Sequence, residues 1–468
     1  MKLLVFVIAV LLLSIVGWRG GDITSDLRTS VPSSSPAQVY NARTDFAVVP
    51  VPSPVPNMGG ATGAGNMIVD PDFDSRIHRL TDIDTIGGAR YAQQQEWHMN
   101  CGGWGDSRVS NLDSTKILIC DGGAGVFVLP FNPSTGKAGT ASPVQGIEGS
   151  PEWSKRQSNI AFATAQSRDP RVMQLDFSVL PPKMALVVNL AKVPHCAEQF
   201  AGTAVWKELS AAWDDATFAM AVGKGTQGSA HIVYVWNANT GCQAYDTEAQ
   251  TVNGLQVRGG GENFFVHSIK ISGDGKVVMV SPSGNSNLRR FWHVGSTDVG
   301  GGPSDGNYGH FAIGYRSFVN AGGHTSDGTW CKLGMAIRLF AALSSPFYVL
   351  TSKQCGDTLA RGDDHVSWND DDTTDTRPFA TSTVTVPLVS PITASWQNEI
   401  LVFMQNGVVH REAHTFNSGK ARFFACQNAI GSISQDGEWF FFSSDWEGTL
   451  GVDKAGDSRC DDFAVALH

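Results

Sequence analysis

The chain has 468 residues, of which 42% are hydrophobic and 17% are charged, so it can bury a large core in one repeat domain or in several smaller domains. The formal net charge of -10 argues against binding to nucleic acid, because phosphate contacts need clustered lysine and arginine. The 51 glycines, together with few helical patterns, indicate many tight turns and favour an all-β fold.

Residues 1–20 have the pattern of a secretory signal. A single basic residue, Lys2, precedes a nearly unbroken apolar run from Leu3 to Trp18, which matches the charged and apolar regions of a signal peptide. A retained membrane anchor is the alternative, although the run is short for the roughly 20 residues of a membrane span. We therefore expect an extracytoplasmic protein (secreted, periplasmic or at the cell surface) with no membrane span beyond this N-terminal segment.

The eight cysteines fit the same expectation, because disulfides persist in oxidising compartments. They fall in pairs along the chain, which predicts four local bridges; several free buried thiols are the alternative. The predicted pairs are Cys101 with Cys120, Cys196 with Cys242, Cys331 with Cys355, and Cys426 with Cys460.

Residues 21–65 are rich in Ser, Pro, Gly and Thr. A segment of this composition buries too little apolar surface to order itself, which predicts a disordered linker or a lightly packed arm. The segment from Ser75 to Asp82 then has the pattern of an isolated strand without a hairpin partner of its own.

Residues 66–468 contain seven strand-turn-strand units. The clearest copy is near the end of the chain, where an alternating strand from Ser432 runs into the turn Gln435-Asp436-Gly437 and then into an aromatic strand from Trp439 to Phe442, the pattern of a β-hairpin. Units that recur at near-regular spacing indicate a repeat architecture. The second strands of the other clear copies are 117–120, 160–163, 218–221 and 277–280, and less regular units lie at 309–320 and around Trp368.

Units of about 57 residues can each supply the four strands of a propeller blade. The last unit is short of one strand, because only 461–467 follow its hairpin as an apolar segment. We therefore predict an all-β, seven-bladed β-propeller over 66–468. We expect the N-terminal strand at 75–82 to complete the last blade, which removes both free edges and closes the ring.

The last unit carries a family resemblance. The stretch Ser434-Gln-Asp-Gly-Glu-Trp-Phe-Phe-Phe-Ser-Ser-Asp-Trp-Glu-Gly448 resembles the Ser-Pro-Asp-Gly, apolar strand, Ser-Asp repeat of TolB-like propellers, which are related to WD40-like repeats. Gln435 stands in place of the usual proline. The resemblance implies the propeller fold and leaves the function open, because propellers host enzymes, ligand-binding proteins and scaffolds.

Two further patterns favour structural roles. Most of the 13 tryptophans fall at strand-turn boundaries, which favours wedging between blades over stacking on sugars. The acidic run from Asn369 to Asp375 lacks the ligand spacing of an EF-hand loop, which favours a solvated turn over a Ca²⁺ site.

Candidate site residues lie at the predicted starts of the innermost strands, which surround one mouth of the propeller channel. His267, His310 and His365 occupy similar places in three consecutive units, and Gln427 lies at the equivalent place in the last unit. Histidines that converge on one axis can bind a divalent metal or act as a general base. We therefore predict these four residues as metal ligands, and His267 and His310 also as catalytic residues. The alternative is that such polar groups cap strands and hydrogen-bond to channel water.

Basic and aromatic residues accompany these strand starts. Guanidinium groups pair with carboxylates in a bidentate manner, which suits an acidic sugar. We predict Tyr315 and Arg316 as further catalytic residues. The predicted substrate-binding residues are Arg289, Arg290, His293 and His414.

This set is similar to the site of propeller-fold polysaccharide lyases of the oligogalacturonate lyase type. The resemblance implies a histidine-rich metal site that neutralises a uronate carboxylate, and a base that removes the proton α to it. Family members place a glutamine and further histidines on the last inner strand. Gln427 matches that pattern, whereas Ile430 and Ser432 stand where ligands are expected.

The sequence therefore predicts an exported propeller that binds a ligand, such as a glycan or a surface polymer, at the mouth of its central channel. The first alternative is a polysaccharide lyase that cleaves a uronate-containing polymer by metal-assisted β-elimination. The second alternative is a non-catalytic cell-surface scaffold with protein partners, which needs no such site. A divalent metal ion is the one cofactor that the sequence suggests.

Overall fold

The structure is a computed structural model of the chain, and statements below about what is present or absent concern the residues that it describes. The predicted signal at 1–20 and the first part of the predicted linker, 21–41, lie outside them. The described residues are 42–85, 97–98, 109–121, 125–165, 169–197, 204–224, 229–259, 261–283, 289–302, 311–321, 335–350, 365–368, 373–383, 395–419, 429–452 and 456–467.

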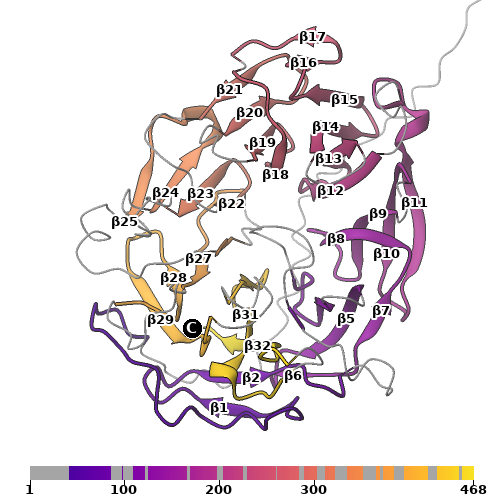
Figure 1. Cartoon of the computed structure of the whole chain (residues 1–468). Helices are drawn as coiled ribbons and strands as arrows, with labels where there is room; N and C mark the ends of the chain where they lie inside the picture. Colours follow the sequence, from indigo (N-terminus) through magenta and orange to yellow (C-terminus); the bar gives the residue numbers. More distant parts are fainter. Residues whose placement is uncertain are drawn as a thin grey trace, which may run out of the picture. The chain divides into compact units, whose positions relative to one another are not determined.

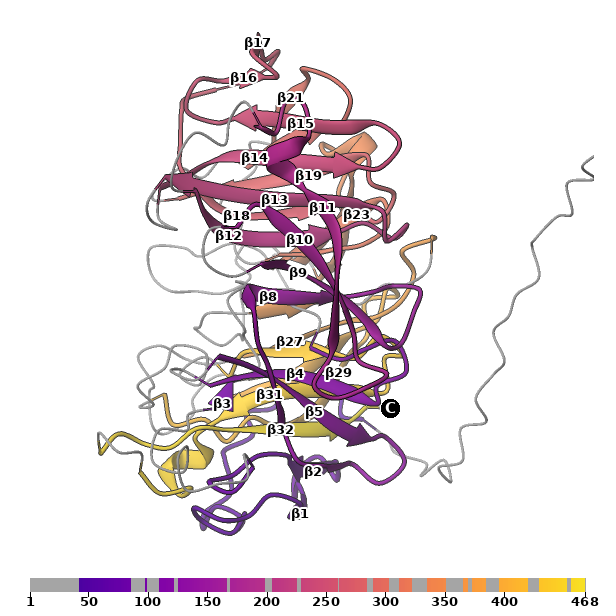
Figure 2. The ribbon, with the colours of Figure 1, turned by 90° about the vertical axis from the view of Figure 1, so that its right-hand side faces the viewer.

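Seven antiparallel sheets stand around a central axis as the blades of a β-propeller (Figures 1 and 2), which confirms the predicted fold. Blade 1 contains β3 (Trp97–His98), β4 (Lys116–Asp121), β5 (Gly125–Asn132), β6 (Lys137–Ala138) and β7 (Ser142–Val144). Blade 2 contains β8 (Ile147–Trp153), β9 (Ile160–Ala165), β10 (Arg171–Asp176) and β11 (Lys183–Asn189). Blade 3 contains β12 (Ala204–Ala211), β13 (Thr217–Lys224), β14 (Ala230–Asn237), β15 (Gly241–Asp246), β16 (Thr251–Val252) and β17 (Leu255–Gln256).

The remaining blades follow in chain order, each from its innermost strand outward. Blade 4 contains β18 (Val266–Ile271), β19 (Val277–Pro282), β20 (Arg290–His293) and β21 (Val299–Gly301). Blade 5 contains β22 (Phe311–Ile313), β23 (Ser317–Ala321), β24 (Met335–Leu339) and β25 (Phe347–Leu350). Blade 6 contains β26 (His365–Ser367), β27 (Phe379–Ser382), β28 (Glu399–Phe403) and β29 (Val409–His414). Blade 7 contains β30 (Gly431–Ile433), β31 (Trp439–Ser444), β32 (Asp461–Ala466), β2 (Arg76–Arg79) and β1 (Met67–Val69).

Helical structure is minor in the described part of the chain. The helices there are the short 3-10 turns η1 (Leu190–Lys192), η4 (Phe340–Ala342) and η5 (Trp446–Gly448). Among the described residues, no helix has the length and apolar character needed to cross a bilayer.

The innermost strand of each blade is a sheet edge, so the backbone N–H groups on its unpaired side need acceptors from outside the sheet. The preceding blade supplies them: Ile269 N donates to Glu208 Oε2 at 2.7 Å, and Ile271 N donates to the Ser210 hydroxyl at 3.2 Å. The contact of Glu208 with residue 269 is followed along both strands by the contact of Ser210 with residue 271. The strands β12 and β18 therefore run in the same direction. We call the end of the channel where the inner strands begin the start face. The end that carries the turns from first to second strands is the turn face.

Turns of neighbouring blades hydrogen-bond to one another at the turn face. Ser154 Oγ in blade 2 donates to Asp215 in blade 3 at 2.5 Å. Blades 7 and 1 are joined in the same way, because Ser114 Oγ donates to Asp436 at 2.9 Å. The polar residues of the predicted turns therefore hold neighbouring blades together as well as reversing the chain.

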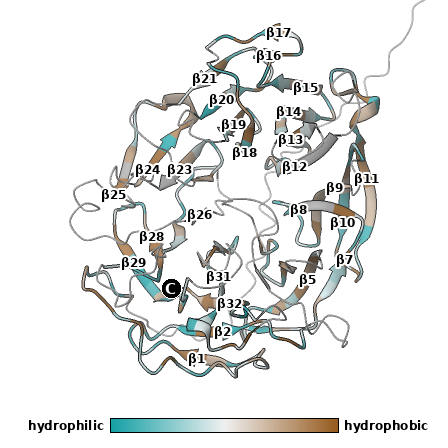
Figure 3. Cartoon of the chain, viewed as in Figure 1, coloured by the Kyte–Doolittle hydropathy of each residue, from teal (hydrophilic) through white to brown (hydrophobic). Residues whose placement is uncertain are grey.

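The apolar core is divided among the gaps between blades. Figure 3 shows apolar residues along the strands of every part of the ring, and the buried clusters combine side chains from neighbouring blades. Trp153, Trp292 and Trp368 are fully buried, and Trp153 Nε1 donates to Val109 O at 3.1 Å across the gap between blades 2 and 1. This supports the predicted role of these tryptophans as wedges between blades.

The ring closes at blade 7, where the N-terminal strand β2 pairs antiparallel with β32. The predicted completion of the last blade by an N-terminal strand is therefore confirmed. The fully buried Arg79 of β2 lies 2.5 Å from Asp461 of β32. The prediction that this strand lacks a hairpin partner is wrong, because β1 pairs with it in turn.

The part of the predicted linker that the structure describes packs against blades 6 and 7. Trp396 Nε1 donates to Asp45 O at 3.1 Å, and Trp446 Nε1 donates to Pro56 O at 2.8 Å. Val49 and Met58 are buried. Composition alone predicted disorder or light packing for this stretch, whereas residues 42–65 supply a few apolar anchors and several backbone acceptors to buried tryptophans.

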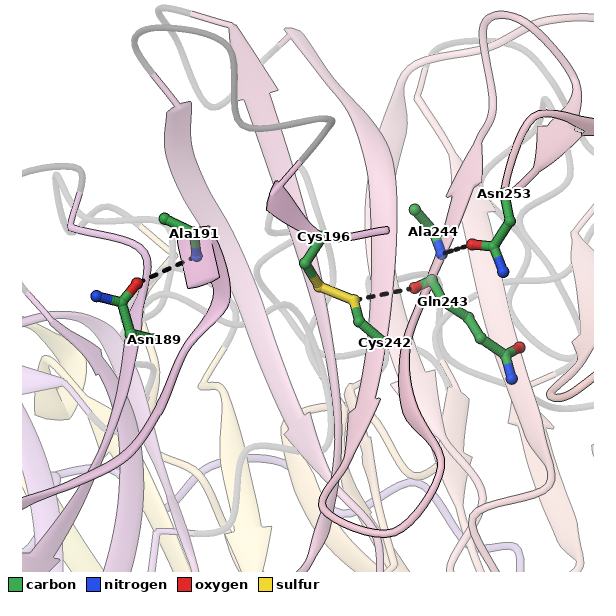
Figure 4. The surroundings of a disulfide bond; sticks show 7 residues. All are labelled: Asn189, Ala191, Cys196, Cys242, Gln243, Ala244 and Asn253. Atoms are coloured by element: carbon green, nitrogen blue, oxygen red, sulfur yellow. Dashed lines mark hydrogen bonds between the residues drawn. A yellow bond between two sulfur atoms is a disulfide. The ribbon is translucent and has the colours of Figure 1, made fainter. Parts of the chain in front are cut away.

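A disulfide joins blades 2 and 3. Cys196 follows η1 at the end of blade 2 and bonds to Cys242 in β15 (Figure 4), with the two Cα atoms 5.7 Å apart. This pairing was predicted from the sequence. Cys120 and Cys460 are also disulfide-bonded. The other predicted pairs involve Cys101, Cys331, Cys355 and Cys426, which lie outside the described residues.

Candidate functional site

His267 lies at the start face, as predicted. It is half-buried in β18 at an irregularity of the strand pairing, where Val266 pairs with Pro282 but Ser268 pairs with Ser281. His267 is thus the extra residue of a β-bulge, a feature that re-aims a side chain and often occurs next to active sites. Of the other predicted metal ligands, His365 is the first residue of β26, and the structure describes its backbone alone. His310 and Gln427 lie outside the described residues.

Arg289 lies at the same end of blade 4 as His267. Its Nε donates to the Ser281 hydroxyl at 3.1 Å, and Ser281 pairs with Ser268, the residue after His267. The guanidinium also lies over the ring of Phe311, 4.4 Å from the ring centre, at the start of the inner strand of blade 5. These contacts hold the cation at the boundary between blades 4 and 5.

Arg290 begins β20 beside Arg289. It is buried, and its guanidinium lies 5.8 Å from the ring centre of Phe264, just before β18. Both predicted arginines of this pair are therefore packed against aromatic rings, Arg289 against the first residue of β22 and Arg290 against a residue just before β18. A guanidinium on an aromatic face gains cation–π stabilisation and keeps a fixed orientation.

Tyr315 and Arg316 lie at the opposite end of the channel from His267. They form the turn between β22 and β23, at the turn face, where Arg316 N donates to Asp375 at 2.8 Å and Tyr315 N donates to the same carboxylate. The Arg316 side chain is 61% exposed and lies 3.7 Å from Asp274. Both residues therefore lie away from His267, because an inner strand separates its own start from its turn. Asp375, from the acidic run, thus links blade 6 to blade 5 through these hydrogen bonds.

His293 and His414 are also apart from the start-face residues. His293 is the exposed last residue of β20, at the far end of the strand from Arg290. His414 ends β29, the outermost strand of blade 6, and is fully buried with Nδ1 3.1 Å from Asp70. The predicted substrate-binding set is thus divided: Arg289 and Arg290 are near His267, whereas His293 and His414 are not.

A buried charged cluster lies on the innermost strands of blades 2, 3 and 4. Lys270 Nζ in β18 lies 3.5 Å from Glu152 in β8 and 3.5 Å from Glu208 in β12, and all three side chains are at most 10% exposed. Buried charges are tolerated when they are paired. Lys270 is not among the residues predicted from the sequence. The signal that could have found it is its position two residues before the turn residue Ser272, which matches Glu152 before Ser154.

Comparison with known proteins supports the fold. No known protein family and no curated protein matches the sequence, but many solved structures have a similar arrangement. One of them, an oligogalacturonate lyase in complex with manganese, superposes with a TM-score of 0.57 over 86% of this chain and 96% of its own chain, at 12% sequence identity. At this identity the similarity establishes the fold alone. The chain is therefore a seven-bladed β-propeller with a distant structural resemblance to oligogalacturonate lyase.

Proposed function

We propose that this protein is an exported propeller that binds an acidic glycan or a similar surface polymer at the start face of its channel. The observation that carries this proposal is the presence of His267 and Arg289 at the same end of blade 4, on residues linked through the Ser268–Ser281 pair. Export is supported by the apolar N-terminal run and by the Cys196–Cys242 disulfide, because such bonds persist in oxidising compartments.

The chemistry of the two side chains suits a carboxylated sugar. A guanidinium pairs with a carboxylate through two parallel hydrogen bonds. Arg289 is already oriented by Ser281 and Phe311, so little side-chain freedom is lost when a ligand binds. His267 adds an imidazole that can donate or accept a hydrogen bond near neutral pH.

Calorimetric titration with oligogalacturonate, against a neutral oligosaccharide of equal length, tests binding. We expect His267→Ala to weaken binding to the acidic oligosaccharide by about 10-fold, the loss of one charge-assisted hydrogen bond. His293→Ala is the matched control, because His293 is an exposed histidine of the same blade at the far end of β20. Equal losses in both variants, or equal affinity for the neutral oligosaccharide, would contradict a start-face site for acidic sugars.

Lyase activity is the second candidate, favoured by the resemblance to oligogalacturonate lyase over 86% of this chain. In β-elimination a base removes the proton α to the carboxylate, a carbon–carbon double bond forms, and the β carbon–oxygen bond breaks to release an alcohol. His267 or His310 is the candidate base, and Arg289 or Arg290 the candidate partner of the carboxylate. A divalent ion held by His267, His310, His365 and Gln427 would neutralise the same carboxylate.

Ultraviolet absorbance distinguishes these functions, because elimination creates an unsaturated uronate and binding does not. We expect a lyase to raise the absorbance of polygalacturonate in the presence of Mn²⁺, and His267→Ala to abolish the increase while His293→Ala retains it. Binding without any increase would support the glycan-binding function. Neither binding nor elimination would favour the non-catalytic scaffold.

A further inference from the structure

We propose that Asp70, Asp72 and His414 form a divalent-metal site that fastens the N-terminal hairpin to blade 6. One ligand atom from each residue lies within 4.8 Å of the others. Asp70 and Asp72 belong to the loop between β1 and β2, and His414 is the last residue of β29. Asp70 and His414 are fully buried, whereas Asp72 is exposed and gives the site an entrance from solvent.

A bulge in β29 brings His414 to this loop. The pairing of β28 with β29 shifts so that Ala413 faces Ile400 while Arg411 faces Leu401. The extra residue between them changes the alternation of sides, so that Arg411 and His414 lie on one face. Both contact the buried Phe73 of the loop: the Arg411 guanidinium lies 5.5 Å from the ring centre, and the two ring centres of Phe73 and His414 are 4.8 Å apart.

The separation of Asp70 and His414 fits two ligands of one metal ion. His414 Nδ1 is 3.1 Å from one carboxylate oxygen of Asp70 and 3.3 Å from the other. Two ligands that each lie about 2.1 Å from a metal, at a right angle, are about 3 Å apart. His414 N also donates to Asp70 at 2.8 Å, which fixes the carboxylate against the imidazole.

The second observation is the unpartnered Nε2 of His414. This atom is buried without a hydrogen-bond partner, and the ring is flanked by Phe73 and Phe416. An N–H can interact favourably with an aromatic face, whereas a bare lone pair cannot. In the tautomer that has its proton on Nε2, the lone pair of Nδ1 faces the carboxylate of Asp70. A cation between the two groups, which are 3.1 Å apart, would then be bound by both, whereas with the proton on Nδ1 the imidazole donates a hydrogen bond to Asp70, and the metal titration below distinguishes the two arrangements.

Arg411, the arginine that shares the Phe73 ring with His414, does not supply that cation. Arg411 forms a two-point ion pair with Glu399, at 2.6 and 2.7 Å, and its Nη1 lies 2.6 Å from Asp45. The charge of Arg411 is thus already used by two other carboxylates. Two carboxylates and one imidazole nitrogen suit a first-row transition ion such as Mn²⁺ or Zn²⁺ better than Ca²⁺ or Mg²⁺, which prefer ligand sets of oxygen alone.

The test is a calorimetric titration of the full-length, metal-free protein with ZnCl₂ or MnCl₂ alone, with thermal unfolding measured in parallel. Asp72→Asn is the test variant, because Asp72 is exposed and its replacement leaves the buried packing intact. Asp74→Asn is the matched control, since it removes the same charge from an exposed position of the same loop. His267→Ala identifies any metal bound at the start face.

We expect the metal to raise the melting temperature of the wild type, of Asp74→Asn and of His267→Ala. In Asp72→Asn the affinity of this site should fall at least ~10–100-fold, the range seen when even a supporting residue of a metal site is lost, and the rise in melting temperature should disappear. Equal affinities of Asp72→Asn and Asp74→Asn would overturn the proposal. So would a wild type that binds neither metal, or one that binds Ca²⁺ as tightly as Zn²⁺.

Discussion

Different interactions stabilise two junctions of the ring, one between blades 2 and 3 and one where the N-terminal strands meet blades 6 and 7. Between blades 2 and 3, the Cys196–Cys242 disulfide adds a covalent bond to the packing of the two sheets. We define the seam as the contact of β1, β2 and residues 42–65 with blades 6 and 7. The N-terminal side of this contact, residues 42–85, contains no cysteine. The seam therefore depends on strand pairing, buried tryptophans and ion pairs.

This difference predicts that the two junctions respond differently to changes of charge, of pH and of covalent bonding. The strength of buried ion pairs depends on the partners being present and ionised. The strength of a disulfide depends mainly on how far it restricts the unfolded chain. Changes of charge and pH should therefore act on the seam, and loss of a covalent bond on the junction of blades 2 and 3.

Replacement of Arg79 by methionine should have the largest effect. Its Nη2 pairs with Asp461 at 2.5 Å, and its Nη1 donates to the carbonyl oxygens of Met58 and Gly60. Without the guanidinium the carbonyl oxygens of Met58, Gly60 and Thr81 lose a donor, and the buried Asp461 keeps Arg459 alone as its cationic partner. We therefore expect a loss of about 3–5 kcal/mol in the free energy of unfolding, measured by urea denaturation. Arg76→Met, at the exposed start of the same strand, should change little. A loss in Arg79→Met below that in Arg76→Met would show that the seam does not depend on this ion pair.

The disulfide should contribute somewhat less. Replacement of both Cys196 and Cys242 by serine removes a link across 46 residues of sequence, for which we expect a loss of about 2–4 kcal/mol. The double variant is preferred to a reducing agent, because Cys120 and Cys460 are also disulfide-bonded. The loss should be the same at pH 6 and pH 8. A loss that changes with pH would contradict the contrast between the two junctions.

Much of this fold could be predicted from the sequence, because local patterns carry it. The alternating strand, the turn with Gly437 at a φ of +77° and the aromatic strand of blade 7 are all local features, and glycine adopts that φ without a Cβ clash. The N-terminal strand could be placed in blade 7 because the last unit lacked one strand. The strand β1 was missed, since it has three residues and two of them, Met67 and Val69, are exposed.

The candidate site could be predicted only in part, for two physical reasons. Residues close in sequence can lie at opposite ends of a strand, as Tyr315 and Arg316 do relative to the start of β22. Bulges also change which face a side chain takes, as at His267 and next to His414. The contact of His414 with Asp70 joins residues 344 positions apart, and no local pattern predicts such a pair.

Glu412 should make the seam sensitive to pH, and we expect this to be the smallest of the three effects. It lies in β29 next to Arg411, which binds Asp45 of the N-terminal segment, and burial raises the pKa of its carboxyl from 4.5 to about 8. Between these two values the folded state holds a proton that the unfolded state has released. The contribution is therefore fully present below pH 4.5 and is lost as the pH rises towards 8, by about 1.4 kcal/mol per pH unit.

Glu412→Gln removes this titration and should flatten the pH dependence. Between pH 6 and pH 8 we expect the wild type to lose about 2–3 kcal/mol more of its free energy of unfolding than the variant does, as measured by urea denaturation at each pH. Glu262→Gln, at an exposed position, should behave like the wild type. The Cys196/Cys242 double variant should keep the wild-type pH dependence, because it leaves β29 unchanged. If Glu412→Gln and the wild type show the same slope, the carboxyl is ionised in the folded state, and the pH sensitivity of the ring must come from groups outside the seam.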